Sequence, residues 1–384
     1  MPLSASMGDQ TDVASRVANG YTLPGSWYTD PTLFELEKRR IFSRAWQYVG
    51  VTAEVPGPGD YLVRHVGHIP VLVVRDESGA VRAFLNVCRH RGSLLIDMSR
   101  EYGHSPDGRA LGIDEDVAPF QCRGHRSSFQ CPYHAWTYKL DGSLRAAPRS
   151  QFELSFDNNE FSLIPARIEL AGSLMFVNPD LDAPPLAQTI GTLPQLFADA
   201  GVDLAGIRRP RRYRECVYRA NWKVTVENFN ECYHCPVVHP GLAAALDVAD
   251  TFKWFEDHDS FSWYGTTARS SGELCHFSFI WPNFGLSSYA GGRHIVTNWM
   301  LPLGLDRTVL FREYFFSDAV DDDEALEAMR MTDQLTREDK GLCEGVQRGL
   351  ETGVFDEGRV LLQSEQGVHQ FQMYVALNLN PSLG

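Results

Sequence analysis

The stretches Cys88-Arg-His90 and Cys131-Pro-Tyr-His134 carry the strongest signal in this chain. Each brings one cysteine and one histidine close together in the sequence. Two thiolates and two imidazoles can hold a [2Fe–2S] cluster, in which the cysteines bind one iron and the histidines bind the other. The imidazole ligands raise the reduction potential above that of an all-cysteine cluster. The four residues therefore predict an electron-transfer site.

A zinc site is the main alternative for these four residues, because two cysteines and two histidines also suit tetrahedral zinc. Zinc sites more often pair cysteine with cysteine and histidine with histidine, whereas both pairs here mix the two types. A zinc protein would be colourless and contain no sulfide, which separates the two interpretations.

Extended to Arg91-Gly92 and to Ala135-Trp136, the same stretches resemble the Rieske domain of the ring-hydroxylating oxygenases. The resemblance is to their alpha (terminal oxygenase) subunits. The chain departs from that family at Ala135, where glycine is usual. Forty residues also separate His90 from Cys131, about twice the usual number.

The extra length lies around Ser99–Ser128, which is rich in Gly, Ser, Arg and Asp and which we interpret as an exposed insertion. It contains a second C-x-x-H, from Cys122 to His125, as an alternative ligand pair. We prefer the later pair, because Pro132, Tyr133 and Trp136 match the family and would shield the cluster. Cys122 and His125 are then expected to be ordinary loop residues.

A second pattern, Glu231-Cys-Tyr-His234-Cys-Pro-Val-Val-His239, resembles the mononuclear-iron segment of the same family. The resemblance makes His234 and His239 ligands of an iron that takes two imidazoles and one carboxylate. On an ideal helix, five residues turn the second side chain by about 140° from the first. We therefore expect Pro236 to distort a helix that begins at Asn221. Asn228, on the same helix, is a further candidate for a catalytic residue.

Cys232 and Cys235 form a C-x-x-C that straddles His234. Such a pair can be a redox or metal motif, but its position suggests packing residues instead. We expect all six cysteines outside the cluster to be reduced thiols, as in a cytosolic protein.

The carboxylate ligand comes from a late helix in this family, and the stretch from Arg337 to Gly349 fits that helix. We assign Asp339 as the third ligand. Glu338 and Asp333 remain alternatives, as does the possibility that Asp339 is only a solvated helix charge.

Composition restricts the function further. The 384 residues are 43% hydrophobic and 22% charged, which suits two globular domains. The net charge of −14 argues against nucleic acid as a partner. No apolar run is long enough for a membrane span, and residues 1–20 lack a signal-peptide pattern, so we expect a cytoplasmic protein.

The expected fold is α+β. Residues 1–43 would be an N-terminal helical segment that packs on the catalytic domain, with a helix capped at Asp30-Pro31. Residues 44–165 would be an all-β Rieske [2Fe–2S] domain, with the insertion at about 99–128. Residues 166–384 would be a helix-grip catalytic domain, an antiparallel sheet with helices, with a long helix over 321–350.

The resemblance implies a terminal oxygenase with one Rieske cluster and one mononuclear Fe(II) per subunit, using O2. Electrons would come from NAD(P)H through a separate flavin/[2Fe–2S] reductase or a ferredoxin, because no G-x-G-x-x-G is present. In the family, electrons pass between neighbours in a ring of three, through an acidic residue. Here Glu231 would link His234 of one subunit to His134 of the partner subunit, although most of the family has Asp.

The substrate remains open. Glu231, the stretch 280–283 and the stretch 367–371 look like choline, glycine-betaine and stachydrine oxygenases, which implies hydroxylation or oxidative N-demethylation. Nine of the thirty residues from Phe252 to Trp281 are aromatic, a set able to cage a quaternary ammonium or simply to pack the sheet. Glu256, Asp257 and Asp259 lie among them. Arene dihydroxylation is the second hypothesis, and a Rieske electron carrier without mononuclear iron is the third.

Overall fold

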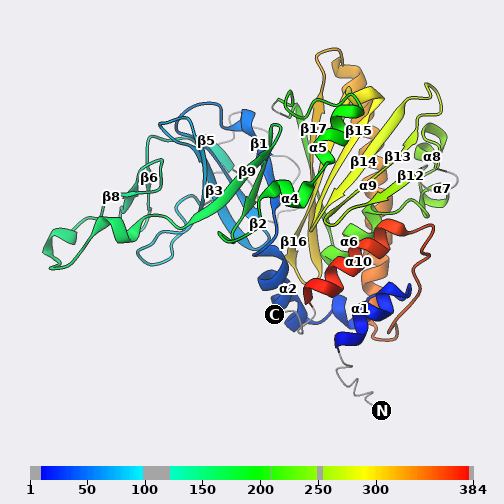
Figure 1. The fold of residues 1–384 in the computed structure, drawn as a ribbon, viewed down its shortest axis with the longest axis horizontal. Helices are drawn as coiled ribbons and strands as arrows, with labels where there is room; N and C mark the ends of the chain where they lie inside the picture. Colours follow the sequence, from blue (N-terminus) through cyan, green and yellow to red (C-terminus); the bar gives the residue numbers. More distant parts are fainter. Residues whose placement is uncertain (1–9, 98–121, 209, 249–253, 380–384) are drawn as a thin grey trace. The chain divides into compact units, whose positions relative to one another are not determined.

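The computed structural model describes residues 10–97, 122–208, 210–248 and 254–379. The chain divides into two compact units (Figure 1). We call Ser43–Gln188 with Leu204–Arg209 the β unit, and Met1–Phe42, Thr189–Asp203 and Pro210–Gly384 the α+β unit.

Two sheets make up the described part of the β unit. A seven-stranded sheet has the order β1-β10-β9-β4-β3-β2-β5, and a three-stranded sheet has the order β6-β7-β8. The strands are β1 (Gln47–Val51), β2 (Asp60–Val66), β3 (Ile69–Arg75), β4 (Val81–Leu85), β5 (Cys122–His125), β6 (Phe129–Gln130), β7 (Thr137–Tyr138), β8 (Leu144–Ala146), β9 (Pro165–Ala171) and β10 (Leu174–Asn178), with 3-10 turns η3 (Thr52–Glu54), η5 (Ser150–Phe152) and η6 (Asn158–Phe161).

Strand β3 shows why these runs form a sheet. Successive side chains of a strand point to opposite faces. Leu72 and Val74 enter one core cluster, whereas Val71 and Val73 enter another. A run of β-branched and aliphatic residues thus supplies both faces of a sheet that is buried on both sides.

The expected domain boundary at residue 166 was wrong. Strand β10 pairs antiparallel with β1 and β9, and β9 pairs with β4. Every residue of β10 is buried. Met175 and Val177 belong to a core cluster of this sheet, so placing them elsewhere would expose that core.

Most of the predicted insertion, residues 98–121, lies outside the described residues. Cys122 and His125 were expected to be loop residues, but they form β5, which pairs with β2. Because side chains alternate along a strand, residues three apart point to opposite faces. Cys122 and His125 therefore cannot turn toward one metal as a ligand pair.

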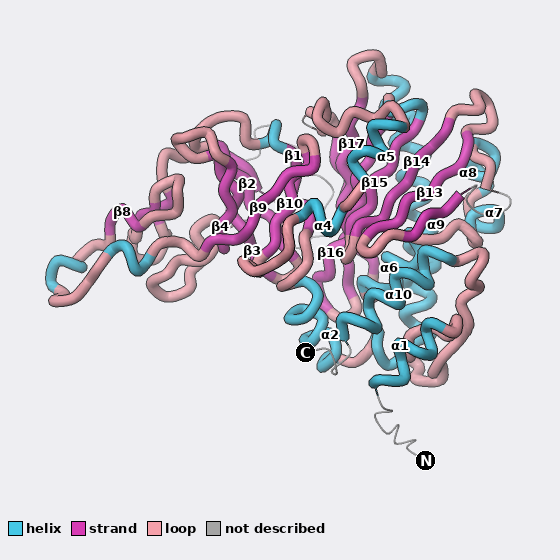
Figure 2. The backbone as a smooth tube through the Cα atoms, viewed as in Figure 1, coloured by secondary structure: helices cyan, strands magenta, loops and turns pink. Residues whose placement is uncertain are grey.

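A seven-stranded sheet with antiparallel neighbours is the centre of the α+β unit, in the order β11-β17-β16-β15-β14-β13-β12 (Figure 2). The expected α+β fold class is confirmed. The strands are β11 (Arg212–Tyr218), β12 (Trp254–Asp257), β13 (Phe261–Thr267), β14 (Leu274–Ile280), β15 (Phe284–Tyr289), β16 (His294–Gly304) and β17 (Arg307–Phe316). The helices are α1 (Gln10–Ala18), α2 (Pro31–Glu37), α5 (Leu193–Asp199), α6 (Trp222–Phe229), α7 (Cys235–Val238), α8 (Pro240–Ala245), α9 (Asp322–Glu351) and α10 (Gln366–Leu379), with short turns η1 (Gly25–Tyr28), η2 (Lys38–Phe42) and η7 (Ala290–Gly292). Helix α4 (Leu186–Ile190) crosses the division between the units.

Two predicted helices begin at side-chain caps, of which Asp30 was predicted and Asp321 was expected to be the first residue of its helix. The Asp30 side chain accepts a hydrogen bond of 2.7 Å from the Thr32 N–H at the start of α2. The Asp321 side chain accepts one of 2.8 Å from the Glu324 N–H at the start of α9. Each cap satisfies a backbone donor that the helix leaves unpaired. No helix in the described ranges combines the length and the apolar character needed to cross a membrane.

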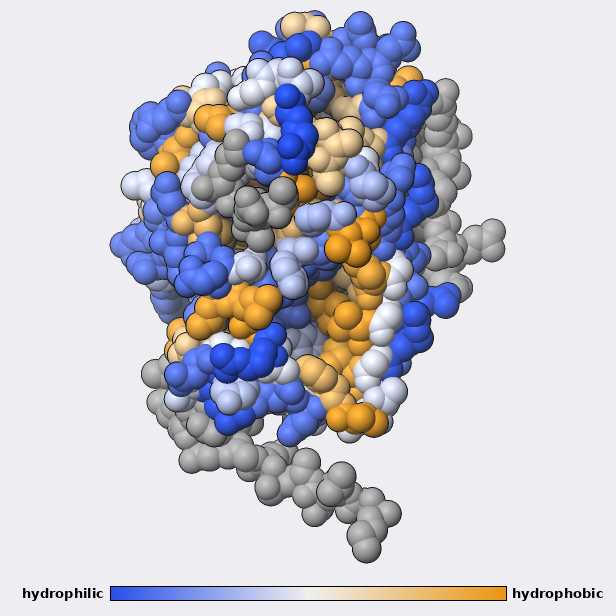
Figure 3. Space-filling view, turned by 90° about the vertical axis from the view of Figure 1, so that its right-hand side faces the viewer, coloured by the Kyte–Doolittle hydropathy of each residue, from blue (hydrophilic) through white to orange (hydrophobic). Residues whose placement is uncertain are grey.

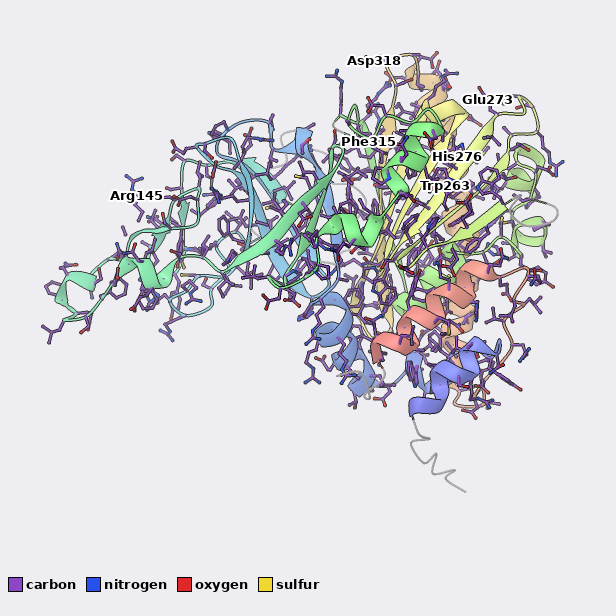
Figure 4. The ribbon with its side chains drawn as sticks, viewed as in Figure 1. Arg145, Trp263, Glu273, His276, Phe315 and Asp318 are labelled. Carbon is purple, nitrogen blue, oxygen red and sulfur yellow. A yellow bond between two sulfur atoms is a disulfide. The ribbon has the colours of Figure 1, made fainter. Side chains whose placement is uncertain are left out.

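Alternation along β13 and β14 divides the aromatic residues between two faces of the sheet. Tyr264 is in register with Phe277 and lies on the face toward α6 and α9. Trp263 lies on the opposite face, where it stacks on His276 at 4.9 Å and meets Phe197 of α5 at 4.8 Å (Figure 4). The described aromatic residues from Trp254 to Trp281 thus serve both packing and the cavity described below.

Candidate metal centres and active site

Two short loops of the β unit hold the predicted cluster residues. The first follows β4, and its Cys88 N–H donates to the Ser93 carbonyl at 2.8 Å. The second joins β6 to β7, and its Cys131 N–H donates to the Trp136 carbonyl at 2.7 Å. These bonds hold each loop in a tight turn, so that each Cys–His pair is presented from one compact loop.

The structure brings the four predicted cluster residues together. Cys88 and Cys131 are each 2% exposed and lie close enough to affect each other, and burial raises the pKa of the Cys88 thiol. The rings of His90 and His134 lie 4.7 Å apart. Nδ1 of His134 is buried and has no hydrogen-bond partner among the described residues. Buried thiols beside two histidines, one with an unpaired ring nitrogen, fit a [2Fe–2S] cluster.

Tyr138 contacts this site and was missed at the sequence level. Its hydroxyl lies 3.2 Å from Cys88 Sγ and accepts a hydrogen bond of 3.0 Å from the Arg89 N–H. Burial raises the pKa of Tyr138, so the hydroxyl keeps its proton. It can therefore donate to a Cys88 thiolate.

The backbone of the second loop explains why the family usually has glycine at the position after His134. Ala135 has a φ of 58°, in the left-handed region. That conformation costs a residue with a Cβ on the order of 1–2 kcal/mol. Ala135 adopts it here, and its N–H donates to the Cys131 carbonyl at 3.0 Å. The departure from the family therefore leaves the turn intact but strained.

In the α+β unit, three predicted ligand atoms surround one point. Nε2 of His234 lies 3.1 Å from Nε2 of His239. Asp339 Oδ1 lies 2.9 Å from the His239 nitrogen and 3.4 Å from the His234 nitrogen. Two imidazoles and one carboxylate that leave other positions open are a ligand set for non-haem iron.

We expected the two histidines to lie on one distorted helix, but they do not. Helix α6 ends at Phe229, and α7 and α8 are separate short helices. His234 precedes α7, and His239 lies between α7 and α8. Pro236 occupies the first turn of α7, where its missing N–H costs nothing, so it starts a helix instead of bending one.

The prediction of reduced thiols was wrong for Cys232 and Cys235, which form a disulfide. The chain turns sharply between α6 and α7, which brings their Cα atoms to 4.9 Å, within disulfide range. Both residues are nevertheless buried in an apolar cluster with Leu246, Val248 and Cys275.

Acidic side chains orient both imidazoles through Nδ1, the ring nitrogen that does not point at the other ligand atoms. Glu338 Oε2 lies 2.6 Å from His239 Nδ1, and Glu231 contacts His234 Nδ1. Such contacts fix the ring that presents its other nitrogen to a metal. Neither alternative third ligand takes the place of Asp339. Glu338 contacts the nitrogen of His239 that points away from the other ligand atoms, and Asp333 accepts a hydrogen bond of 3.1 Å from Arg214 Nε.

The pKa shifts agree with this geometry. Burial lowers the pKa of His234, but its contacts with Asp339 and Glu231 outweigh burial and raise the pKa to about 9. Burial raises the pKa of Asp339, but the two histidines outweigh it and lower the pKa to about 2. The metal-free site therefore attracts a positive charge.

A buried network holds α6 in place. Lys223 and Glu37 form an ion pair in which both side chains are fully buried. Trp222 Nε1 donates to Glu37 Oε2 at 2.7 Å. The network joins the N-terminal segment to the helix before the iron-site loop. At the end of that helix, Asn228 Nδ2 lies 3.4 Å from Asp339 Oδ1.

A cavity of about 120 Å³ adjoins the three convergent ligand atoms. Three aromatic rings, those of Tyr264, Phe277 and Tyr289, form one wall. Tyr264 stacks on Phe277 with centroids 5.8 Å apart, and Phe277 meets Tyr289 at 5.5 Å. Glu256, Asp257 and Asp259 are not among the described residues that line this cavity.

Comparison with known proteins identifies the same two kinds of domain. Residues 45–155 match the Rieske [2Fe-2S] domain, and residues 207–380 match the ring hydroxylating alpha subunit (catalytic domain). Choline monooxygenase from Amaranthus tricolor is 32% identical, over 94% of this chain and 78% of that protein. The carnitine monooxygenase oxygenase subunit of Acinetobacter baumannii is 29% identical, over 93% of this chain and 94% of that protein.

A solved structure gives the same result in three dimensions. The quaternary ammonium Rieske monooxygenase CntA in complex with L-carnitine superimposes with a TM-score of 0.80 at 27% identity, covering 96% of this chain and 98% of that chain. With its [2Fe–2S] cluster and its mononuclear iron, this chain belongs to the Rieske non-haem iron oxygenases, as a terminal oxygenase (alpha) subunit.

Proposed function

We propose that this oxygenase acts on a small quaternary ammonium compound, which it hydroxylates or N-demethylates. The observation that carries the proposal is the wall of three adjacent aromatic rings beside the iron ligands. Ring faces attract cations within about 6 Å of the centroid. The cavity of about 120 Å³ is also below the roughly 300–1,000 Å³ of pockets for drug-sized ligands.

Cys88, His90, Cys131 and His134 would hold the cluster, and His234, His239 and Asp339 would hold the iron. The cluster supplies single electrons and the iron site supplies dioxygen chemistry. The protein's own contribution is orientation and exclusion of water. Glu338 and Glu231 hold the imidazoles, and the aromatic wall holds the methylated ammonium beside the ligand atoms.

We further propose that the subunit works in a homotrimer, in which Glu231 relays electrons between subunits. Each metal site has an exposed aromatic residue next to a predicted ligand. Tyr233, beside His234, is 56% exposed, and Tyr133, beside His134, is 58% exposed. Patches of hydrophobic residues, separated by polar ones, also lie on the face shown in Figure 3. Exposed apolar surface of this kind marks protein contacts.

The electron donor would be an NAD(P)H-dependent reductase or a ferredoxin, in the cytoplasm. Apart from the two predicted cluster ligands, four cysteines are free thiols, which supports a reducing compartment, whereas Cys232 and Cys235 form a disulfide.

Metal analysis and oxygen uptake test the proposed function. The wild-type protein should contain about three irons per chain, by ligand count, and Asp339→Ala should keep only the two cluster irons. With a surrogate reductase, oxygen uptake should respond to N-methylated ammonium compounds and release hydroxylated or demethylated product. Uptake with aromatic acids alone, yielding cis-diols, would favour arene dihydroxylation. Two irons in the wild type would favour the electron carrier.

A further inference from the structure

Arg312 places a positive charge in the wall of the iron-site cavity. Its Nε donates to Asn298 Oδ1 at 2.7 Å. Its Nη1 donates to the Thr332 carbonyl at 3.1 Å and contacts Thr336 Oγ1. These bonds fix the plane of the guanidinium. An aromatic wall alone would explain the binding of any quaternary ammonium, but it does not explain a fixed cation in the same cavity.

The second terminal nitrogen of Arg312 is free to bind a ligand. Nη2 makes no hydrogen bond or ion pair with any residue in the described part of the chain. It is also not one of the fully buried atoms without a partner, so it retains accessible surface. Arg312 is one of the residues that line the cavity, so this nitrogen is the donor of Arg312 that a ligand could use. The guanidinium N–H donors match the geometry of anionic oxygen groups such as carboxylates.

Helix α9 sets the spacing between the two ends of a zwitterionic ligand. Thr332 and Thr336 hold Arg312, and Asp339 lies three residues beyond Thr336 on the same helix. At 1.5 Å per residue, Thr336 lies about 4.5 Å and Thr332 about 10.5 Å from Asp339 along the helix axis. A ligand with a methyl group near the iron and a carboxylate on Arg312 would therefore span several ångströms. A betaine has that length when one to three carbons separate nitrogen from carboxylate.

We propose that Arg312 binds the carboxylate of a zwitterionic substrate, so that this enzyme prefers betaines to quaternary ammonium alcohols such as choline. The inference rests on the proposed function and names its substrate class. The ammonium would lie against the aromatic wall and the carboxylate on the Arg312 guanidinium.

Binding to the wild-type holoenzyme gives the first test. Isothermal titration would compare glycine betaine with its methyl ester and with choline, which share the trimethylammonium group. Hydrogen bonds between charged groups correspond to roughly 10- to 100-fold in affinity, and we expect glycine betaine to bind tighter by that factor. Equal binding of all three compounds would overturn the role of Arg312 and leave the proposed function standing. Binding of none would overturn the proposed function itself.

A matched pair of variants gives the second test. Arg312→Gln should weaken glycine betaine binding by roughly 10- to 100-fold and leave choline binding unchanged or stronger. Arg214→Gln is the control, because Arg214 is directly opposite Arg312 in the sheet but is paired with Asp333. It should change neither affinity. If Arg312→Gln binds neither glycine betaine nor choline while its iron content is intact, Arg312 is a structural residue and the proposal fails. If this variant does not fold, the wild-type comparison decides alone.

Discussion

Glu338 and His239 are joined by a hydrogen bond of 2.6 Å between Oε2 and Nδ1, on the side of the imidazole that faces away from the other ligand atoms. The next residue of α9, Asp339, contacts the other nitrogen of the same ring at 2.9 Å. Two successive residues of α9 therefore contact the two nitrogens of the His239 ring. Glu338 orients the ring, and Asp339 is the neighbouring metal ligand.

This relationship predicts the effect of Glu338→Ala. The variant should keep the cluster spectrum and the fold, but its iron affinity should fall by roughly 10- to 100-fold, as when other partners behind metal-bound histidines are removed. Competition with a chelator would measure it. Asp333→Ala is the matched control on the same helix, since Asp333 pairs with Arg214. If the two variants lose iron equally, the effect belongs to the helix and not to the hydrogen bond.

The pKa of His234 predicts how iron binding depends on pH. In the metal-free site its contacts with Asp339 and Glu231 raise the pKa to about 9. A bound proton must leave before the imidazole can bind iron. Burial lowers the pKa of His239, but Asp339 and Glu338 outweigh burial and raise it, so this ligand must lose a proton as well. Iron affinity should therefore rise by at least about tenfold per pH unit from pH 7 to about pH 9, and then level off. Anaerobic Fe(II) titrations at several pH values would check this, and a flat profile would contradict it.

The cluster ligands predict a contrast between two C-x-x-H pairs. His134→Ala should abolish the visible and EPR signals of the Rieske cluster, because the variant lacks one of four ligands. Cys122→Ser should leave both signals unaltered, because β5 directs Cys122 and His125 to opposite faces. An intact spectrum in His134→Ala would move the ligand role to another residue.

Tyr138→Phe should lower the reduction potential of the cluster. The hydroxyl lies 3.2 Å from Cys88 Sγ, and a hydrogen bond to a ligand sulfur stabilises the more negative, reduced cluster. Loss of the hydroxyl should shift the potential downward with the cluster content unchanged. Protein-film voltammetry would measure the shift, with Tyr133→Phe as a control, since Tyr133 is exposed. An upward shift would show that the hydroxyl does not donate to the sulfur.

The local parts of the sites were predictable from the sequence, because their ligands lie within short, chemically specific stretches. Cys88 to His90, Cys131 to His134 and His234 to His239 each required only spacing and residue type. Helix caps such as Asp30 were predictable for the same reason, since the cap and the first turn are adjacent.

What the sequence did not reveal depends on contacts between distant residues. Glu37 pairs with Lys223 across 186 residues, and no local pattern marks either residue as buried. Strand β10 was assigned to the wrong domain because its partner β1 lies far away in the sequence. The break between α6 and α7 was also missed, because we took Pro236 to bend a helix when its other common role is to begin one.

Glu231→Gln is the sharpest test of electron transfer between subunits. The Glu231 carboxylate contacts Nδ1 of His234 and accepts a hydrogen bond of 3.2 Å from the His234 N–H. Glutamine has nearly the same shape, so both metal sites and the oligomer should persist. It lacks the negative charge that holds an imidazole N–H in the donor orientation toward Glu231, and one edge of its amide donates instead of accepting. The reductase should therefore still reduce the cluster, but reoxidation after addition of substrate and oxygen should slow by orders of magnitude. Single-turnover stopped flow would measure that step, with Glu365→Gln as a control for the loss of a nearby carboxylate. Reoxidation at the wild-type rate, with full metal content, would restrict Glu231 to orienting His234 and would require another path between the cluster and the iron.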